Sequence, residues 1–260
     1  MPNYVLVASS QDLAGTTMVD CLKEKGFESG SPASYSNVNL HVTEASLLTL
    51  ESLDDVYPDT EAFVFLSKHR SDSGIPTLTC HCTGNFAGAP FGGNPKEIAT
   101  AYPSLQKAYL KAITKAGVTN YEVVIEATHH GPTSLTKPVL FVELGSSEKQ
   151  WTDRNAAGAM CDCVLEVLKN VEPCSKVGIA IGGTHYPTKF NKLLLESDFG
   201  LAAVASKYNL EAIDENMMAQ MIEKSVEKVT HIVLDAKSLG SHKDRITTLA
   251  EKTGLEILKV

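Results

Sequence analysis

Short apolar segments alternate with amphipathic segments along this chain, and this alternation constrains its fold more than any other feature. The short segments have the length and side chains typical of strands, and the others have the periodicity of helices. The pattern predicts an α/β fold with a mixed, mostly parallel sheet flanked by helices. We expect strands at 4–8, 38–42, 62–66, 78–82, 121–127, 139–144, 176–181, 230–234 and 255–258. We expect helices at 11–25, 44–53, 104–115, 215–226 and 243–253, and one that starts after 147 or 153 and ends at 168.

The length of the chain favours one domain. At 260 residues it is long for one domain and short for two, and no repeat or low-complexity linker divides it. Glycine and proline residues between 84 and 95 predict a long irregular loop. We therefore expect a single domain over 1–260, with a small lobe over 84–103 as its one elaboration.

Composition argues against several classes of protein. No segment approaches the roughly 20 apolar residues of a membrane span, and the N-terminus does not resemble a secretory signal. We expect a cytoplasmic monomer or weak dimer with no membrane partner. The net charge of −8 argues against general binding of DNA, but not against a local basic pocket for one nucleic-acid end. Candidates for that pocket are Lys68, Arg70, Lys107, Lys111, Lys115, Lys189 and Lys192.

The six cysteines form no C-x-x-C pair, which favours reduced thiols. Cys80 and Cys82 flank His81, a pattern that invites a zinc site. Alternation along a strand would turn both thiols away from the imidazole, however. We expect both cysteines to be buried as small hydrophobic residues.

Polar clusters follow several of the expected strands. The most informative is the pair His129-His130, because two adjacent imidazoles need four partners for their ring nitrogens and titrate near neutrality. Ligands of α/β sheets gather beyond the carboxyl ends of the strands, so these clusters predict a site there. They are Ser67-Lys-His-Arg-Ser71, Thr79-Cys-His-Cys-Thr-Gly-Asn85, Glu126-Ala-Thr-His-His-Gly-Pro-Thr133, Glu143-Leu-Gly-Ser-Ser-Glu148 and Gly182-Gly-Thr-His-Tyr-Pro187.

The clusters suit hydrolysis of an acyl bond, which needs an activated water, a proton shuttle and donors for the oxyanion. The zincin, α/β-hydrolase, P-loop and Rossmann motifs are all absent. Glu126 and Glu143 could be bases or metal ligands, and the histidines could shuttle protons or bind zinc. If the strand continues through His130, then Glu126, Thr128 and His130 share one face and His129 takes the other.

Five of these blocks resemble the archaeal and plant type of D-aminoacyl-tRNA deacylase. The blocks Glu126-Ala-Thr-His-His-Gly-Pro-Thr133 and Glu143-Leu-Gly-Ser-Ser-Glu-Lys-Gln-Trp151 carry most of the resemblance, which spans most of the chain. It implies hydrolysis of the ester between a D-amino acid and the terminal ribose of tRNA, a proofreading activity, and also removal of N-alkylated D-aminoacyl adducts of aldehydes. It further implies a fold similar to the phosphorylase and peptidyl-tRNA hydrolase group, and zinc as cofactor.

We infer roles for individual residues on this basis. His130 or Glu126 would activate water, and His129, His185 and Thr128 are further catalytic candidates. His69 and His185 would orient the substrate, and Lys68 and Arg70 would contact phosphates of the tRNA acceptor end. Candidates for substrate or tRNA binding are Ser67, Lys68, His69, Arg70, His81, Gly182, Gly183 and Lys189, and the candidate zinc ligands are His129, His185 and Glu143.

Three other functions use the same residues. The first is a metal-dependent aminopeptidase or amidohydrolase that acts on small substrates. The second is a module that binds the acceptor stem without catalysis. The third is a nucleoside phosphorylase, which would need a phosphate pocket.

Overall fold

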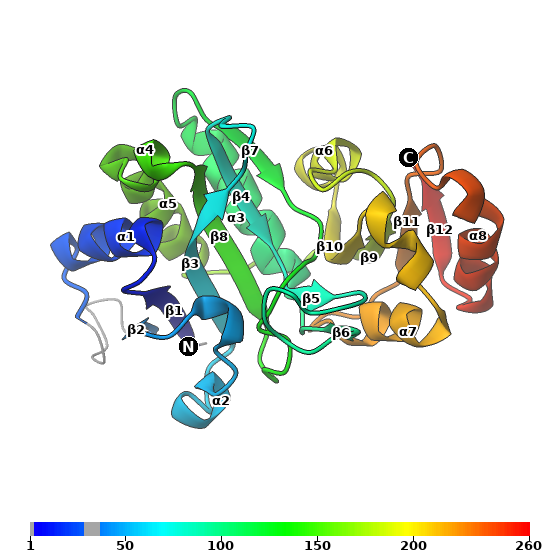
Figure 1. The fold of residues 1–260 in the computed structure, drawn as a ribbon, viewed down its shortest axis with the longest axis horizontal. Helices are drawn as coiled ribbons and strands as arrows, with labels where there is room; N and C mark the ends of the chain where they lie inside the picture. The colour runs from blue at the N-terminus through cyan, green and yellow to red at the C-terminus, as the bar shows by residue number, and fades with distance from the viewer. Residues whose placement is uncertain (1–2, 29–36) are drawn as a thin grey trace.

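Two sheets lie side by side along the long axis of the computed structural model, which describes residues 3–28 and 37–260 (Figure 1). The first sheet has the order β2 (Val38–Thr43), β1 (Tyr4–Ser9), β3 (Ala62–Arg70), β8 (Val139–Ser146), β4 (Thr77–His81) and β7 (Glu122–Ile125). Neighbours are parallel except β4 and β8. The short segment 71–76 reverses the chain after β3, and β8 inserts between β3 and β4. The predicted mixed, mostly parallel architecture is confirmed, although it is divided between two sheets.

The second sheet is entirely parallel, in the order β10 (Phe199–Ala205), β9 (Lys176–Ile181), β11 (His231–Leu234) and β12 (Glu256–Lys259). Neither β10 nor the helix before it, α6 (Thr188–Glu196), was predicted from the sequence. The strand β10 consists mainly of small residues, Gly-Leu-Ala-Ala-Val-Ala after its first phenylalanine, and these carry little strand propensity.

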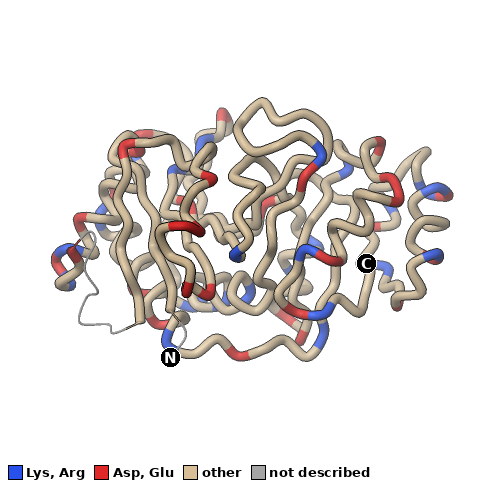
Figure 2. Tube along the Cα trace, turned by 90° about the horizontal axis from the view of Figure 1, so that it is seen from below, with Lys and Arg blue, Asp and Glu red and all other residues tan. Residues whose placement is uncertain are grey.

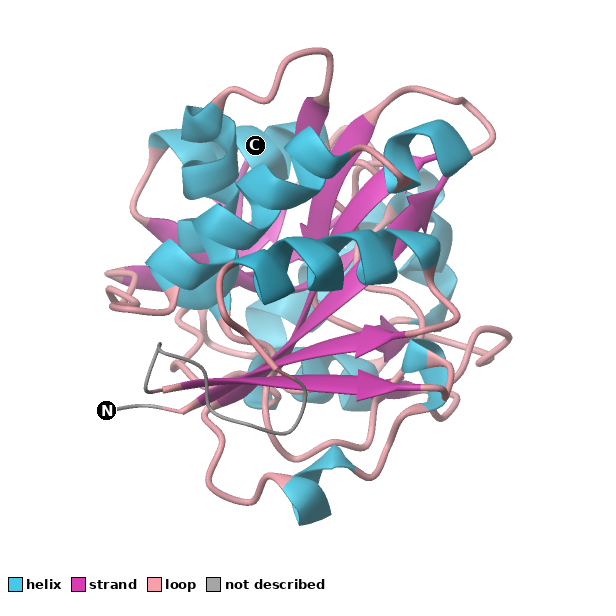
Figure 3. Cartoon of the chain, turned by 90° about the vertical axis from the view of Figure 1, so that its left-hand side faces the viewer, coloured by secondary structure: helices cyan, strands magenta, loops and turns pink. Residues whose placement is uncertain are grey.

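Helices cover both sheets (Figure 3). The helices α1 (Leu13–Glu24), α3 (Pro103–Ala116) and α5 (Arg154–Val167) pack on one face of the first sheet and form the largest apolar core. On the opposite side of its strands lie α2 (Leu53–Val56) and the short 3-10 turn η1 (Leu47–Thr49). The helices α7 (Glu215–Glu223) and α8 (Lys243–Lys252) pack against the second sheet, and α4 (Glu148–Trp151) precedes α5. Two more 3-10 turns are η2 (Lys207–Ala212) and η3 (Gly240–His242). None of the helices in the described segments is long and apolar enough to span a bilayer.

The predicted helix over 44–53 was wrong, because this segment is anchored to a distant loop. The Glu51 carboxylate accepts hydrogen bonds from the backbone N–H groups of Thr133 and Ser134, at 3.0 and 2.9 Å. Asp54 likewise accepts from the N–H of Thr136 at 2.6 Å. These bonds hold the chain in short turns, η1 and α2, where local propensity alone favours a continuous helix.

Residues 127 and 128 join the two sheets. The N–H of Ala127 donates to the carbonyl of His185, and the N–H of Thr128 donates to the carbonyl of Val204 in β10, both at 2.8 Å. The Thr128 hydroxyl accepts from the N–H of Val204 at 3.0 Å and contacts the Cys82 sulfur at 3.0 Å. The polar clusters that follow the strands of the first sheet therefore meet those of the second sheet at this seam. A two-stranded ribbon of β5 (Gly84–Asn85) and β6 (Glu97–Ile98) lies beside it.

Candidate active site

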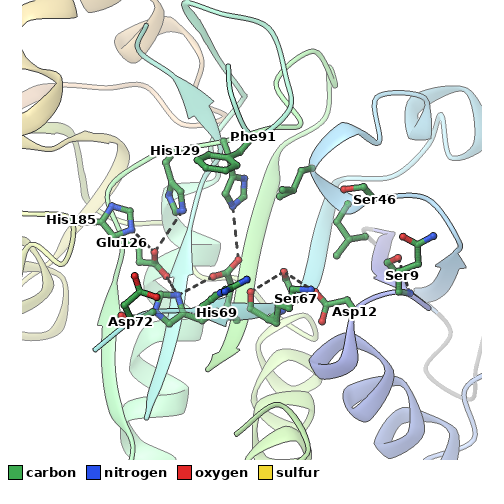
Figure 4. A pocket seen from close by; sticks show the side chains of 18 of the residues that line it. Ser9, Asp12, Ser46, Ser67, His69, Asp72, Phe91, Glu126, His129 and His185 are labelled. Carbon is green, nitrogen blue, oxygen red and sulfur yellow. Dashed lines mark hydrogen bonds and ion pairs between the residues drawn. The ribbon is translucent and has the colours of Figure 1, made fainter. Parts of the chain in front are cut away.

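A cavity of about 760 Å³ opens where the strands β1, β3 and β8 end (Figure 4). Most of the residues predicted for the site line it. The strand β3 continues through Arg70 rather than ending at Leu66, so Ser67 and His69 are buried on one face while Lys68 and Arg70 are exposed on the other. The predicted residues that line the cavity are Ser67, Lys68, His69, Arg70, Glu126, His129, His130, Glu143 and His185.

Two buried carboxylates and one imidazole form the floor of the cavity. Glu126 and Glu143 are only 1% and 4% exposed. The Nδ1 atom of His69 lies 3.0 Å from Glu126 Oε1 and 3.4 Å from Glu143 Oε2. Burial opposes a charge on His69, but its hydrogen bonds to both carboxylates outweigh that effect and raise its pKa to about 10. His69 is therefore a cation at neutral pH, and it allows two carboxylates to stay ionised side by side.

Neighbours fix the position of the His69 imidazole. Its Nε2 atom lies 2.9 Å from the Tyr186 hydroxyl, and Trp151 Nε1 donates to its backbone carbonyl at 2.8 Å. Gly145 is the register partner of His69 in β8, and a Cβ there would collide with the His69 backbone. This close approach explains why a glycine follows Leu144 in a strand.

Glu126 also holds His185, which comes from the second sheet. His185 Nε2 lies 2.7 Å from Glu126 Oε2. Burial would raise the pKa of Glu126, but hydrogen bonds from His185 and His69 outweigh burial and hold it well below its usual range. An ionised carboxylate only accepts hydrogen bonds, so His185 Nε2 carries the proton. In the neutral ring Nδ1 is then the basic nitrogen, on a side chain that is 38% exposed and lines the cavity.

Three further histidines share one orientation. The Nδ1 atoms of His81, His129 and His130 lie 3.1, 2.8 and 2.7 Å from the backbone carbonyls of Cys82, Ala127 and Gly131. A carbonyl can only accept, so each Nδ1 carries a proton, and Nε2 is bare in the neutral form of each ring. The three side chains bring ligand atoms within 4.8 Å of one another.

The electrostatics of this trio fit a bound cation. His81 Nε2 is buried without a hydrogen-bond partner. Burial opposes its protonation, but Glu143 outweighs burial and raises the pKa of His81. Burial, together with His81, lowers the pKa of His130 to about 4 and that of His129 well below its usual range. A backbone carbonyl behind each imidazole is the usual support of a metal-binding histidine.

Other groups could also hold a metal ion. They are Glu126 with His129 and His185, and His69 with Glu126 and Glu143. The ligand set expected from the sequence, His129, His185 and Glu143, is divided between these groups. No such group among residues 3–28 and 37–260 contains all three.

The backbone after β7 differs from the expected strand. The strand ends at Ile125, and His130 has a φ of 42°, so strand alternation does not continue to His130. The two adjacent imidazoles therefore join one cluster, with ring centroids 4.3 Å apart, instead of pointing to opposite faces. Gly131 packs so closely against Gly93 and Leu48 that a Cβ there would collide with their backbones.

Several predicted residues lie elsewhere. Thr128 is buried in the seam and is not among the residues that line the cavity. Gly183 and Lys189 line a separate small cavity at the second sheet, and a Cβ on Gly182 would meet Ser238 and Asp235 there. Lys189 Nζ pairs with Asp235 at 2.7 Å. His81 is fully buried behind Glu143. Cys80 and Cys82 are buried, as predicted.

Among the residues that line the cavity, several have no role predicted from the sequence, including Asp12, Phe91 and Tyr186. Asp12 follows β1 and Tyr186 follows β9, so the strand-end rule that found the histidines could have found both. Phe91 is 65% exposed and lies in the irregular loop, where no sequence signal distinguishes it.

Comparisons with known proteins agree with the motif resemblance. A family model described as D-aminoacyl-tRNA deacylase matches residues 56–258. A D-aminoacyl-tRNA deacylase of Cenarchaeum symbiosum is 36% identical over 98% of both chains. Another, of Hyperthermus butylicus, is 39% identical over 83% of this chain and 82% of its own.

The fold has a solved counterpart. A crystal structure of a conserved protein of unknown function matches with a TM-score of 0.92 and 28% identity, over 99% of this chain and 95% of that one. Because that protein is described only as one of unknown function, the family is shown by the sequence matches. The chain belongs to the D-aminoacyl-tRNA deacylase family.

Proposed function

We propose that the protein hydrolyses the ester bond of D-aminoacyl-tRNA, releasing the D-amino acid and free tRNA. The observation that carries this proposal is the convergence of two ionised carboxylates and four histidines at one cavity, with His81 buried behind them, in a chain of this family. Such a site supplies a base, fixed charges and proton donors to an acyl carbon. The comparisons lend no support to the alternative of an aminopeptidase or amidohydrolase.

His185 acts as the general base in this proposal, in place of His130. Its Nδ1 takes a proton from water as the water oxygen attacks the ester carbonyl carbon. The imidazolium then returns that proton to the ribose oxygen as the ester bond breaks. Glu126 holds the required tautomer through the 2.7 Å bond to Nε2 and stabilises the positive ring. His130 is poorly suited to this role, because its pKa of about 4 makes it a weak base.

His69 places a positive charge between the two buried carboxylates. As a cation between Glu126 and Glu143 it offsets their repulsion, and Tyr186 holds its second nitrogen. Its loss would leave two buried carboxylates with one fewer partner, which is strongly unfavourable.

Zinc is the cofactor that we propose for the trio His81, His129 and His130. Their bare Nε2 atoms, backed by carbonyls, are the donor set that zinc prefers in proteins. When bound, zinc supplies a Lewis acid that polarises a carbonyl and lowers the pKa of water. The three residues must be neutral to bind it. Burial lowers the pKa of His129 and of His130, and only His81, whose pKa Glu143 raises, would have to release a proton.

Lys68 and Arg70 bind phosphates of the tRNA acceptor end. Both are exposed at the rim of the cavity, and Lys68 Nζ also lies over the Trp151 ring, 5.7 Å from its centroid. Elsewhere Lys and Arg are interspersed with Asp and Glu along the chain, which fits a local contact better than a broad nucleic-acid face (Figure 2). Acceptor-end binding of this kind needs no dimer, and we place the protein in the cytoplasm with its tRNA substrate.

The experiment is a comparison of matched D- and L-aminoacyl-tRNA. Purified protein is incubated with the same tRNA carrying either enantiomer, and deacylation is followed with time. We expect rapid loss of the D-form and little loss of the L-form. Binding of tRNA without deacylation would instead identify a non-catalytic binding module, and cleavage of peptides alone would identify an aminopeptidase.

A further inference from the structure

The cavity extends well beyond the carboxylates and histidines. Its volume of about 760 Å³ is within the range that encloses a ligand larger than an amino acid. Beyond Ser67, residues from the end of β1 and from the turn after β2 form a second half of the cavity (Figure 4). This half contains Ser9, Asp12, Ser46, Leu47 and Leu48, and the proposed chemistry uses none of them.

Asp12 is the one ionisable group in this half. It is 7% exposed, and it caps α1 by accepting from the N–H of Gly15 at 2.8 Å. Its second oxygen accepts from the N–H of Lys68 at 3.1 Å and lies 3.5 Å from the Ser67 hydroxyl. Within the described segments, no cationic side chain comes within salt-bridge distance of Asp12, and a carboxylate can accept about four hydrogen bonds. Burial raises its pKa in spite of the two N–H donors. The carboxylate can therefore accept another donor from a ligand in the cavity.

The position of Asp12 indicates which group of the substrate could donate a hydrogen bond to it. Asp12 follows β1, and Glu143 is in β8, with β3 between them. Neighbouring strands are about 4.8 Å apart, so the two carboxylates lie roughly 10 Å apart across the sheet. The ammonium group of an aminoacyl ester is only two bonds from the reacting carbonyl. The base of the esterified nucleoside is separated from that carbonyl by a whole ribose, and phosphates would be repelled by Asp12.

We propose that this half of the cavity binds the 3′-terminal adenosine of the tRNA, whose exocyclic amine donates a hydrogen bond to Asp12. Leu47 and Leu48 offer an apolar wall to the face of the base. Adenosine is invariant among the substrates, whereas the amino acid varies. This contact therefore places the ester bond of every substrate at the same position in the cavity. The inference rests on the proposed deacylation and names the group that positions its substrate.

The test combines a substrate change with a change in Asp12. D-aminoacyl-tRNA ending in adenosine is compared with the same tRNA ending in purine riboside, which lacks the amine. For the unchanged protein we expect kcat/KM to fall about 10- to 100-fold, the range for a lost hydrogen bond to a charged acceptor. Asp12→Ser and Asp12→Asn should lower kcat/KM by a similar factor with adenosine and show no further loss with purine riboside.

Controls separate this role from others. Serine and asparagine are good helix N-caps, so both variants should keep α1 and the melting temperature. Asp20→Asn, an exposed carboxylate on the same helix, should behave like the unchanged protein. An N-acetyl-D-aminoacyl-tRNA series tests the ammonium. If acetylation lowers kcat/KM for the unchanged protein but not for the Asp12 variants, Asp12 binds the ammonium group and the inference is wrong. The inference is also wrong if purine riboside lowers kcat/KM equally for all the proteins. Failure of the unchanged protein to act on any D-aminoacyl-tRNA would refute the proposed function instead.

Discussion

Replacement of Glu126 by glutamine is the sharpest test of the active site. The side chain keeps its size, but an acceptor oxygen becomes an amide donor that faces His185 Nε2 or His69 Nδ1, which both lie within 3.0 Å of the carboxylate. His185 then loses the group that keeps its proton on Nε2. His69 also loses one of the two carboxylates that raise its pKa.

The expected magnitudes follow from burial. Each hydrogen bond to a charged group contributes about 1.5–3 kcal/mol, and breaking a buried ion pair costs about 3–5 kcal/mol. We therefore expect Glu126→Gln to lower the free energy of unfolding by about 4 kcal/mol and the melting temperature by roughly 10 °C. The rate of chemistry should fall by about 10³-fold, since misorientation of a general base has effects of that order.

The assay is single-turnover deacylation of D-aminoacyl-tRNA, with tRNA affinity measured separately. The rate should fall while the dissociation constant changes by less than about threefold, because Glu126 is buried in the floor of the cavity. Glu122→Gln, an exposed carboxylate in β7, the strand that ends just before Glu126, is the matched control and should change neither. His185→Gln keeps an N–H donor for Glu126 but removes the proposed base, so it should lose rate without losing stability.

A particular result would refute this reasoning. If folded Glu126→Gln deacylates within threefold of the unchanged protein, Glu126 does not orient a base. If His185→Gln is fully active, the base is another residue.

The other predictions concern pH, salt and metal. The pKa of His69 rises from 6.5 to about 10 on folding, so its stabilising effect is complete below pH 6.5 and is lost as pH rises toward 10. The melting temperature of His69→Gln should lack this alkaline decline. Parallel curves of melting temperature against pH for the two proteins would contradict the assignment. Lys68→Ala and Arg70→Ala should each weaken tRNA binding and reduce the slope of log affinity against log salt by about 0.7, whereas Lys149→Ala, exposed on α4, should not. His130→Asn, a substitution that tolerates positive φ, should lower the zinc content measured by mass spectrometry and the thermal stabilisation by added zinc; equal zinc content in both proteins would remove His130 from the ligand set.

Local sequence patterns predicted most of the fold, because most elements carry their own periodicity and caps. Tyr4–Ser9, Lys176–Ile181 and the helix Pro103–Ala116 agree with expectation to within about two residues. The failures have a tertiary cause. Glu51 binds a loop more than 80 residues away and replaces a helix by turns, and β10 is built from small residues whose strand character comes from pairing with β9.

The site was less predictable than the fold. The sequence placed the Glu and His clusters at strand ends, and most of these residues do meet. Their individual environments depend on contacts that no sequence window contains: His69 is held by carboxylates from two other segments, and the positive φ of His130 arises where Gly131 packs on Leu48 and Gly93. The different roles that we propose for the histidines follow from these contacts.

The seam at Ala127 and Thr128 has a mechanical consequence. Ala127 grips the backbone of His185 with a hydrogen bond, one residue from the carboxylate that binds its ring. Sliding of one sheet past the other would move His185, the proposed base, relative to Glu126. The position of His185 relative to Glu126 therefore depends on how the two sheets pair at this seam, and we expect substitutions of Val204, whose backbone is hydrogen-bonded to Thr128, to affect it although Val204 does not line the cavity.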